Sequence, residues 1–495
     1  MGLLKDSAKV FTGVTLQRLI SFLMLPIIAR LIGPHDYGIF QAALSICALF
    51  TVFGSLSLDA SIPVADSADK AALRTIGTGL IGLMGAILFT VAALLMQPVL
   101  AGWFSHKIVH AVIWMVPILV PLTIASNSLR NYAGYLGKFG YFAIADISAA
   151  ITNFTVIALV YVTLWRDYRA LIAGAVAALL AKIMILLWCA EFGRTFKARL
   201  KMVTILREMR QTRSFAKYYL PSNALNVYSA ELPTIMLAWV FPESVVGVFM
   251  MAKSLIMIPT SMCSQALGQV FYPKAAKNFR DGGQLTDITW QSFNYASMFS
   301  IFPAFFMAAA GVYIIPTLLG TQWIGTAPYM LLLVPMVILK AVETQIGIGF
   351  VFSILNQFKK ILRGNLILFV CRFSPFLGCL YLSSSPHIAI LSFSLGSALG
   401  YAYLTGWIFQ TVGISLTRAG KVFMRYCLYS AVCVLPIFLV YSNSNRILPI
   451  SALLVALVAY TGVVWFLFFN QRQRSDVIKK FGLWNQKESQ DTSSG

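Results

Sequence analysis

Two stretches of the sequence, one in each half of the chain, share an order of residues that decides the fold. The first is LPIIARLIGPHDYGIFQAALSI (Leu25–Ile46), and the second is LPTIMLAWVFPESVVGVFMMAKSLI (Leu232–Ile256). Each has a Leu-Pro pair in an apolar run, a second proline at a turn (Pro34 and Pro242), and then Gly, an aliphatic residue and Phe. Because many transporters are built from duplicated helical bundles, this match predicts two related halves.

The composition around these stretches is that of a membrane protein. Of the 495 residues, 59% are apolar and 11% are charged, whereas soluble domains carry about 25% charged residues. This balance excludes an ordinary cytosolic domain and a disordered chain. Apolar runs long enough to approach the ~20 residues of a membrane-spanning helix lie at 10–32, 38–58, 76–96, 109–129, 142–164, 170–192, 219–241, 246–271, 294–316, 327–354, 364–383, 387–410, 426–441 and 447–469.

The distribution of Lys and Arg predicts the orientation of these fourteen spans. Of 38 Lys and Arg residues, 28 lie on one side together with both termini, 4 lie on the opposite side, and 6 lie within spans. Since basic connections stay in the cytoplasm, both termini are predicted to be cytoplasmic. The densest basic segment, Arg194–Lys217, follows the sixth span and is expected to contact anionic lipid headgroups.

These patterns predict an all-α polytopic membrane protein with fourteen transmembrane helices in four parts. Residues 1–217 form an N-terminal lobe of spans 1–6 with the basic linker, and residues 218–425 form a C-terminal lobe of spans 7–12. Residues 426–469 hold spans 13 and 14, and residues 470–495 form a cytoplasmic tail. The sequence has no GxxxxGK[ST] phosphate loop, which argues against a pump with its own ATPase motor.

Charged residues within the spans are the candidate functional residues, because a charge at mid-membrane costs at least ~2.5–3.5 kcal/mol and usually faces a cavity or a partner. The basic candidates are Arg18, Arg30, Lys182, Lys253, Lys340 and Arg372, with Arg30 near the outer end of span 1. The acidic candidates are Asp146, Glu231 and Glu343. Cations therefore outnumber carboxylates inside the membrane.

Local pairing accounts for part of this set. Lys340 and Glu343 are three residues apart on one helix, and Glu231 and Lys253 lie eleven residues before and after Pro242, at about the same depth. Pairing of these four leaves Arg18, Lys182 and Arg372 with Asp146 as the remaining carboxylate. Arg and Lys bind phosphate groups, so the surplus predicts an anionic cargo with a phosphate or pyrophosphate head. Outward movement of one negative charge is favoured by ~2.3 kcal/mol per 100 mV.

Cysteine and histidine give no sign of a metal or redox site. The seven cysteines fall inside apolar runs without two-residue spacing and are expected to be packing residues. All four histidines map to the predicted outer side; His106 and His110 have i, i+4 spacing but no third ligand nearby. We therefore expect no metal, no cofactor and no catalytic residue.

Three features together resemble the polysaccharide transporter family, the Wzx-type O-antigen flippases of the MATE-like MOP superfamily. They are RLIGPHDYGIFQAA (Arg30–Ala43), VFPESVVGVFMMAKSL (Val240–Leu255) with FYPKAA (Phe271–Ala276), and the fourteen-span order with cytoplasmic termini. The resemblance implies a V-shaped pair of six-helix lobes around a cationic cavity in the bacterial inner membrane. It implies transport of undecaprenyl-pyrophosphate-linked oligosaccharide to the periplasmic leaflet by alternating access, with ion coupling.

Carried onto this sequence, the resemblance gives Arg18, Arg30 and Lys253 as cavity cations and Glu231 as an acidic partner. Glu231, Glu343 and Asp146 are the candidates for proton or sodium coupling. The expected partners are the lipid-linked saccharide, anionic lipids, and polysaccharide polymerase or chain-length machinery, with no nucleic acid. The alternatives are a drug or cation exporter of the same superfamily, a membrane-embedded polymerase or glycosyltransferase, and a peptidoglycan-precursor flippase.

Overall fold

A computed structural model describes residues 2–138, 140–189, 202–346, 351–352, 354–355, 357–382, 385–439 and 447–468. Within these ranges the backbone forms helices joined by short turns, and no strand occurs there. This confirms the predicted all-α class. The predicted cytoplasmic tail, 470–495, and residues 194–201 of the basic segment lie outside the described residues.

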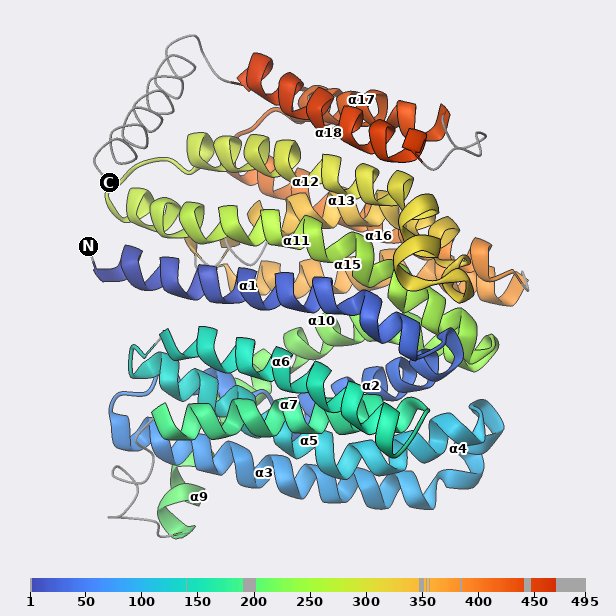
Figure 1. The fold of residues 1–495 in the computed structure, drawn as a ribbon. Helices are drawn as coiled ribbons and strands as arrows, with labels where there is room; N and C mark the ends of the chain where they lie inside the picture. The colour runs from blue at the N-terminus through green and yellow to red at the C-terminus, as the bar shows by residue number, and fades with distance from the viewer. Residues whose placement is uncertain are drawn as a thin grey trace, which may run out of the picture.

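The helices follow one another with short connections (Figure 1). The first half contains α1 (Gly2–Leu31), α2 (Pro34–Ser55), η1 (Leu58–Ser61), α3 (Ala68–Leu95), α4 (Gln97–Trp103), α5 (His106–Tyr135), α6 (Gly140–Thr163), α7 (Tyr168–Cys189) and α9 (Met202–Gln211). The second half contains α10 (Arg213–Val240), α11 (Glu243–Arg280), α12 (Thr286–Ile314), η2 (Ile315–Leu319), η3 (Thr321–Trp323), α13 (Thr326–Ile346), α15 (Phe358–Leu382), α16 (Pro386–Val412), α17 (Leu416–Leu439) and α18 (Ile447–Phe468).

Each of the fourteen predicted apolar runs overlaps one of these helices. Within the described part of the chain, eleven helices are long and apolar enough to cross a membrane. The other three predicted runs coincide with α1, α10 and α18, so the count of fourteen crossings stays a prediction. The helices α4 and α9 were not expected; the first lies in a predicted outer connection and the second in the basic linker.

The surface of the bundle is apolar along the spans. Large side chains such as Trp188, Leu382 and Leu399 are at least 70% exposed, although they lie in the middle or at the ends of long helices. A monomeric soluble protein rarely exposes contiguous apolar area of this extent. The outward-facing side chains therefore fit contact with lipid rather than water.

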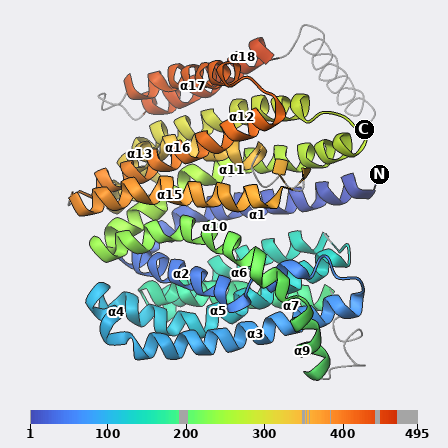
Figure 2. The same cartoon turned by 180° about the vertical axis from the view of Figure 1, so that it is seen from behind.

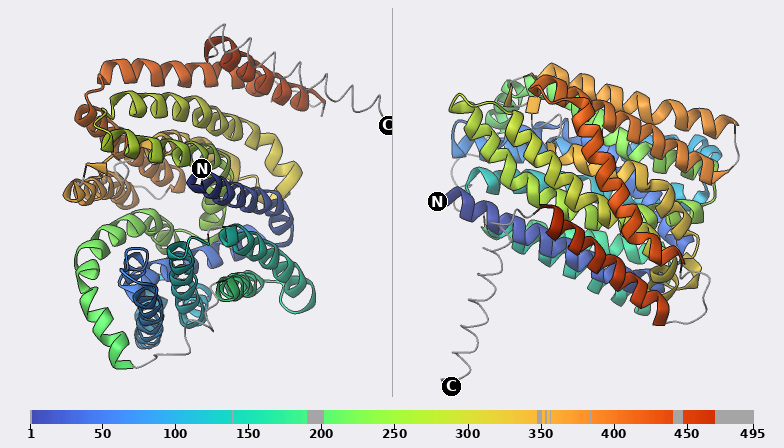
Figure 3. Two further views of the ribbon diagram at one scale, coloured as in Figure 1. Left: turned by 90° about the vertical axis from the view of Figure 1, so that its left-hand side faces the viewer. Right: turned by 90° about the horizontal axis from the view of Figure 1, so that it is seen from above.

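The two halves repeat one pattern of helix packing with an offset of six spans. In the first half α3 packs on α5, α6 on α7, and α2 on α5. In the second half the counterparts α12 and α13, α15 and α16, and α11 and α13 pack in the same way. Views from opposite sides and along the helices show the two groups next to each other (Figures 2 and 3). This repetition is the one that the two Leu-Pro stretches predict.

The helices α17 and α18 lie at the edge of the second group, where α17 packs on α12 and on α18. Contacts between the two halves come mainly from α2, which packs against α10 and α11, with a smaller contribution from α1 against α11. The predicted part boundaries at residues 217, 425 and 469 are not tested by this packing and stay predictions.

The two repeat stretches meet where α2 and α11 begin. A Cβ atom placed on Gly38 would lie 1.8 Å from the backbone oxygen of Glu243, and one on Gly247 would lie 1.9 Å from the backbone oxygen of Pro34. Each helix thus packs a glycine directly on a first-turn carbonyl of the other. Only the absence of side chains at both positions allows this approach.

Further contacts close the same end of the molecule. Trp323 donates from Nε1 to the Ala29 oxygen at 2.7 Å, and its ring meets the Tyr37 ring edge-on at 5.7 Å. Arg30 donates from Nε to the Leu318 oxygen at 2.8 Å and from Nη2 to the Thr317 oxygen at 2.7 Å. We call the contacts of Ala29, Arg30, Tyr37 and Trp323, with the Gly38–Gly247 crossing, the outer seal, because this end is predicted to face outward.

Candidate functional site

Five of the nine predicted site residues lie together in the second half of the chain. They come from α10, α11, α13 and α15, and we call them the second-half cluster: Glu231, Lys253, Lys340, Glu343 and Arg372. Lys340 interacts electrostatically with the other four members, and Lys253 also interacts with Glu231 and Arg372. Arg372 is buried within the protein, and Lys253 and Lys340 are partly buried. Three cations and two carboxylates leave one positive charge in excess.

Glu231 lies at the junction of the two halves. Its Oε2 accepts a hydrogen bond from the Ser45 hydroxyl of α2 at 2.8 Å. Lys253 of α11 donates to the Ala230 oxygen of α10 at 3.4 Å and interacts with the Glu231 carboxylate. The equal depth of Glu231 and Lys253 that the spacing about Pro242 predicts is therefore compatible with the observed geometry.

Arg372 connects three helices of the second half. It is 5% exposed, and it donates from Nη1 to the Ser229 oxygen of α10 at 3.2 Å and to the Ser229 hydroxyl. Its Nη2 donates to the Tyr401 hydroxyl of α16, and its guanidinium carbon lies 4.9 Å from the centre of the Tyr401 ring. The Nε atom of Arg372 is buried and has no hydrogen-bond partner among the described residues. An unsatisfied donor on a buried cation is costly unless an acceptor arrives.

Arg18 links α1 to α11 away from the second-half cluster. Its side chain is partly buried, and Nη1 donates to the Ser261 hydroxyl of α11. Ser261 in turn donates to the Ile258 oxygen at 3.0 Å. Arg18 therefore bridges the two halves at a depth where α1 and α11 run next to each other.

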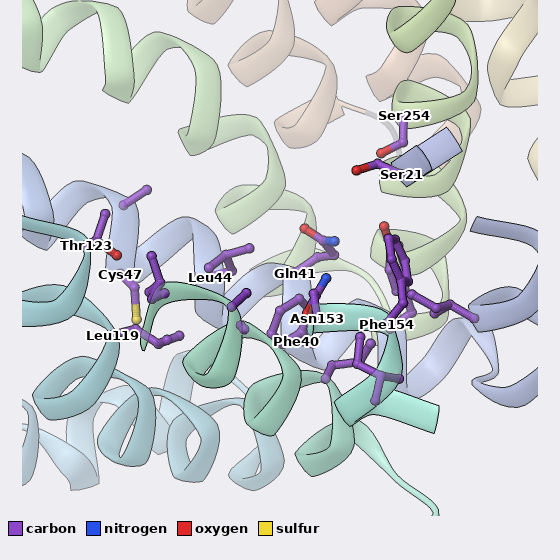
Figure 4. Close-up of a pocket in the computed structure, with 18 of the residues that line it drawn as sticks. Ser21, Phe40, Gln41, Leu44, Cys47, Leu119, Thr123, Asn153, Phe154 and Ser254 are labelled. Atoms are coloured by element: carbon purple, nitrogen blue, oxygen red, sulfur yellow. The ribbon is translucent and has the colours of Figure 1, made fainter. Parts of the chain in front are cut away.

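A cavity of about 490 Å³ lies beyond Arg18 and extends toward the outer seal. It is enclosed mostly by α1, α2, α5, α6 and α7 of the first half, with α11 on one side (Figure 4). Most of its lining is apolar, and its polar side chains are uncharged: Ser21, Tyr37, Gln41, Thr51, Thr123, Asn153 and Ser254. Among the described residues that line the cavity, none carries a formal charge.

Lys182 and Asp146 lie in a separate group within the first half. Lys182 Nζ is 2.9 Å from Asp146 Oδ1, and Arg130 Nη1 donates to both carboxylate oxygens at 2.8 and 2.6 Å. Arg130 also lies over the Phe142 ring, 4.8 Å from its centre. The sequence alone leaves Asp146 as the one remaining carboxylate for Arg18, Lys182 and Arg372. In the structure its partners are Lys182 and Arg130.

Arg30 lies apart from both groups, in the outer seal, where its contacts are backbone carbonyl oxygens of η2. The structure therefore brings five predicted residues together, places Lys182 with Asp146, and leaves Arg18 and Arg30 at the α1 interfaces. Among the described residues, no group of three His, Cys, Asp or Glu side chains is arranged to hold a metal.

Sequence reasoning missed the neutral partners of these charges. Ser45, Ser229 and Tyr401 hydrogen-bond to Glu231 or Arg372, yet each is an ordinary polar residue in an apolar helix. A weak signal existed for Ser45, because it follows Gln41 by four residues and so continues a polar stripe on α2. Arg130 was missed because it was counted in the connection after the fourth span, whereas α5 continues to Tyr135.

Comparison with known proteins identifies one family and several solved structures with a similar fold. Residues 27–328, more than half of the chain, match the family described as "Polysaccharide biosynthesis protein". No curated protein matches the sequence. The structure titled "Lipid II flippase MurJ, inward closed conformation" is similar over 91% of this chain and 97% of its own, with 12% identity and a TM-score of 0.67.

Two MATE structures are also similar. The structure of the "MATE multidrug transporter DinF-BH" matches over 83% of this chain and 95% of its own, with 15% identity and a TM-score of 0.55. An inward-facing "multidrug resistance MATE family transporter of the MOP superfamily" matches over 85% and 95%, with 13% identity and a TM-score of 0.51. At these identities the likeness concerns the fold, and it confirms the predicted fold class.

Proposed function

Because the chain belongs to the polysaccharide biosynthesis protein family, we propose that it is a flippase rather than an enzyme. Its cargo is an undecaprenyl-pyrophosphate-linked oligosaccharide of the O-antigen type. It moves this cargo from the cytoplasmic to the periplasmic leaflet of the bacterial inner membrane by alternating access. The similar structure of the lipid II flippase MurJ supports the proposal through a shared fold.

The observation that carries the proposal is the charge of the buried groups between and within the two halves. The second-half cluster holds three cations against two carboxylates, and Arg18 adds a cation whose described partner is a hydroxyl. Buried unpaired charge is costly in a membrane protein, and an anionic cargo would neutralise it. A cationic drug would meet an excess of charge of its own sign, which favours the flippase over the exporter.

Among the predicted cations, we assign contact with the pyrophosphate to Arg18, Lys253, Lys340 and Arg372. Arg30 holds the outer seal in place through the backbone carbonyl oxygens of η2, and Lys182 holds the first half in place through the carboxylate of Asp146. The isoprenoid tail stays in lipid while the head passes between the halves. Glu231 and Glu343 lie among the cargo-binding cations and are the groups that couple transport to a proton or sodium ion, with Asp146 as the candidate in the first half.

The experiment that tests the function is deletion of the gene, followed by analysis of the lipid-linked intermediates that accumulate in the cells. Single repeat units retained on the cytoplasmic leaflet are the expected result. Unpolymerised units already exposed on the periplasmic side would identify the chain instead as part of the polymerase step. In the proposed pathway, polymerase or chain-length machinery acts on the units that this protein delivers.

Site variants test the mechanism. Arg18→Ala and Lys253→Ala are each expected to lower surface polysaccharide at equal protein expression, since each removes a cation from the cargo path. Lys70→Ala is the matched control, because Lys70 forms an exposed pair with Asp66 at 2.8 Å, and exposed pairs contribute little. Unchanged polysaccharide in both site variants would contradict the mechanism.

A further inference from the structure

The neutral cavity of the first half offers a second kind of recognition beside the buried cations. It measures about 490 Å³, within the ~300–1,000 Å³ typical of small-molecule sites. Its polar groups include the amides of Gln41 and Asn153 and the hydroxyls of Ser21, Thr123 and Ser254 (Figure 4). From these groups we infer that the cavity is a binding site for the uncharged saccharide of the cargo. This inference rests on the proposed function.

The chemistry of the lining fits sugar hydroxyls. A side-chain amide offers two donor hydrogens and one acceptor oxygen, so each amide can pair with a hydroxyl in either direction. The aromatic rings of Phe40 and Phe154 line the same cavity and offer flat apolar faces. An isoprenoid tail has no group that could form a hydrogen bond with the amides of Gln41 and Asn153.

The position of the cavity fits the covalent order of the cargo. Ser21 follows Arg18 by three residues, about one turn along α1, and Ser254 precedes Ser261 by seven residues, about two turns along α11. A pyrophosphate at Arg18 would therefore place the attached sugar beside Ser21 and Ser254. From Ser21 to Ile28, which also lines the cavity, α1 rises about 10 Å toward the outer seal.

The absence of charge in this lining gives the site a preference. An acidic sugar would bring a carboxylate into a mainly apolar cavity whose lining residues include no cation, and an unpaired buried charge is costly. Neutral and N-acetylated sugars would bind without this cost. The site thus separates the two parts of the cargo: the cations bind the pyrophosphate, and the cavity selects the saccharide.

The polar groups of the cavity also reach the outer seal. The Tyr37 hydroxyl hydrogen-bonds with the side chains of Gln41 and Ser254, and the Tyr37 ring meets the Trp323 ring edge-on. A saccharide that binds Gln41 competes for this network. The side chain of Tyr37 therefore takes part both in the polar network of the cavity and in the closed outer seal.

Binding to purified protein in nanodiscs tests the inference with two probes. The first is undecaprenyl pyrophosphate without sugar, and the second carries a neutral hexose disaccharide. Gln41→Met and Asn153→Leu, which keep side-chain size but remove hydrogen bonds, are each expected to weaken the disaccharide probe about tenfold and to leave the sugarless probe within twofold of wild type. Thr163→Val is the control, because it also removes a polar side-chain group from α6, at an exposed position that does not line the cavity.

The outcomes separate this inference from the proposed function. Arg18→Gln is expected to weaken the binding of both probes. If Arg18→Gln binds each probe as tightly as the wild type does, the proposed function is overturned. If Arg18→Gln weakens both probes while Gln41→Met and Asn153→Leu bind both like wild type, the saccharide site is wrong and the function stands. Equal weakening of both probes by the cavity variants would identify the tail as the occupant and overturn the inference.

A comparison on the wild-type protein needs no variant. A probe whose disaccharide contains glucuronic acid in place of one glucose is expected to bind at least tenfold more weakly than the neutral disaccharide probe. Equal affinity for the acidic and neutral probes would overturn the inference, since a cavity without charged lining residues cannot bind both equally.

Discussion

The outer seal depends on two glycines, and replacement of either by alanine gives the sharpest test of the proposed conformational change. In Gly38→Ala the new Cβ would lie 1.8 Å from the Glu243 oxygen, and in Gly247→Ala it would lie 1.9 Å from the Pro34 oxygen. Carbon and oxygen atoms in such contacts are at least about 3.3 Å apart. The first turns of α2 and α11 must therefore separate by about 1.5 Å.

The free energy of this separation follows from the cost of overpacking. Insertion of a methyl group into a well-packed contact costs about 1–3 kcal/mol. Because α2 and α11 belong to different halves, the strain exists while the seal is closed and is relieved when it opens. A difference of 1–3 kcal/mol shifts the ratio of open to closed molecules by about 5–150-fold. The double variant is expected to shift it by less than the product of the single effects, since one movement relieves both contacts.

Spin labels across the outer end measure this ratio. Val99→Cys in α4 and Ile324→Cys after η3 are suitable positions, with 48% and 55% exposure, in a chain whose seven native cysteines have been replaced. Both glycine variants are expected to gain a longer-distance population. Gly79→Ala is the matched control, since no atom lies within 4 Å of its added Cβ. Unchanged distances in folded Gly38→Ala and Gly247→Ala, or an equal change in Gly79→Ala, would refute the reasoning.

Three further predictions concern the seal and the cytoplasmic side. Arg30→Met removes two hydrogen bonds to carbonyl oxygens of η2, so the same labels should report a larger open population; an unchanged ratio would exclude Arg30 from the seal. Glu208→Ala leaves Arg74 buried without the partner that it meets at 2.9 Å, and loss of a buried pair costs about 3–5 kcal/mol. Amide exchange within α9 should accelerate, and wild-type rates there would contradict a role for this pair. Burial raises the pKa of Asp59 in η1. The protonated carboxyl therefore favours the folded protein at low pH, and this contribution to the free energy of unfolding is lost as the pH rises through the raised pKa. Asp59→Asn should therefore raise the unfolding temperature at pH 8 more than at pH 4, and an equal change at both pH values would contradict this assignment.

The spans were predictable because their signals are local and long. Hydropathy over about 20 residues identifies a helix such as α5 without knowledge of its neighbours, and alternation of Lys and Arg gives an independent check. The same window cannot detect α4, which has seven residues between Met96 and Phe104. It also misses α9, where Ile205 and Met209 face α3 within a segment dominated by its basic residues.

The pairing of the charges was only partly predictable. Lys340 and Glu343 share a helix, and the turn at Pro242 relates Glu231 to Lys253, so helix geometry alone indicates their proximity. The partners of Lys182 depend on how α5, α6 and α7 pack together, which no spacing in the sequence encodes. The same holds for Arg30, whose acceptors lie 287 and 288 residues away along the chain.

In the proposed mechanism, the two similar halves bind different parts of the cargo. The same helix packing recurs in both, yet the first half lines most of a cavity with neutral residues and the second half holds the charged cluster. On α2, the side chain of Gln41 lines the cavity, whereas Ser45, one turn further along, binds Glu231 of the second half. A movement of α2 that opens the Gly38–Gly247 crossing therefore also changes the surroundings of the saccharide and of the charged cluster. A head group with one charged part and one neutral part is the cargo that would use both halves during such a movement.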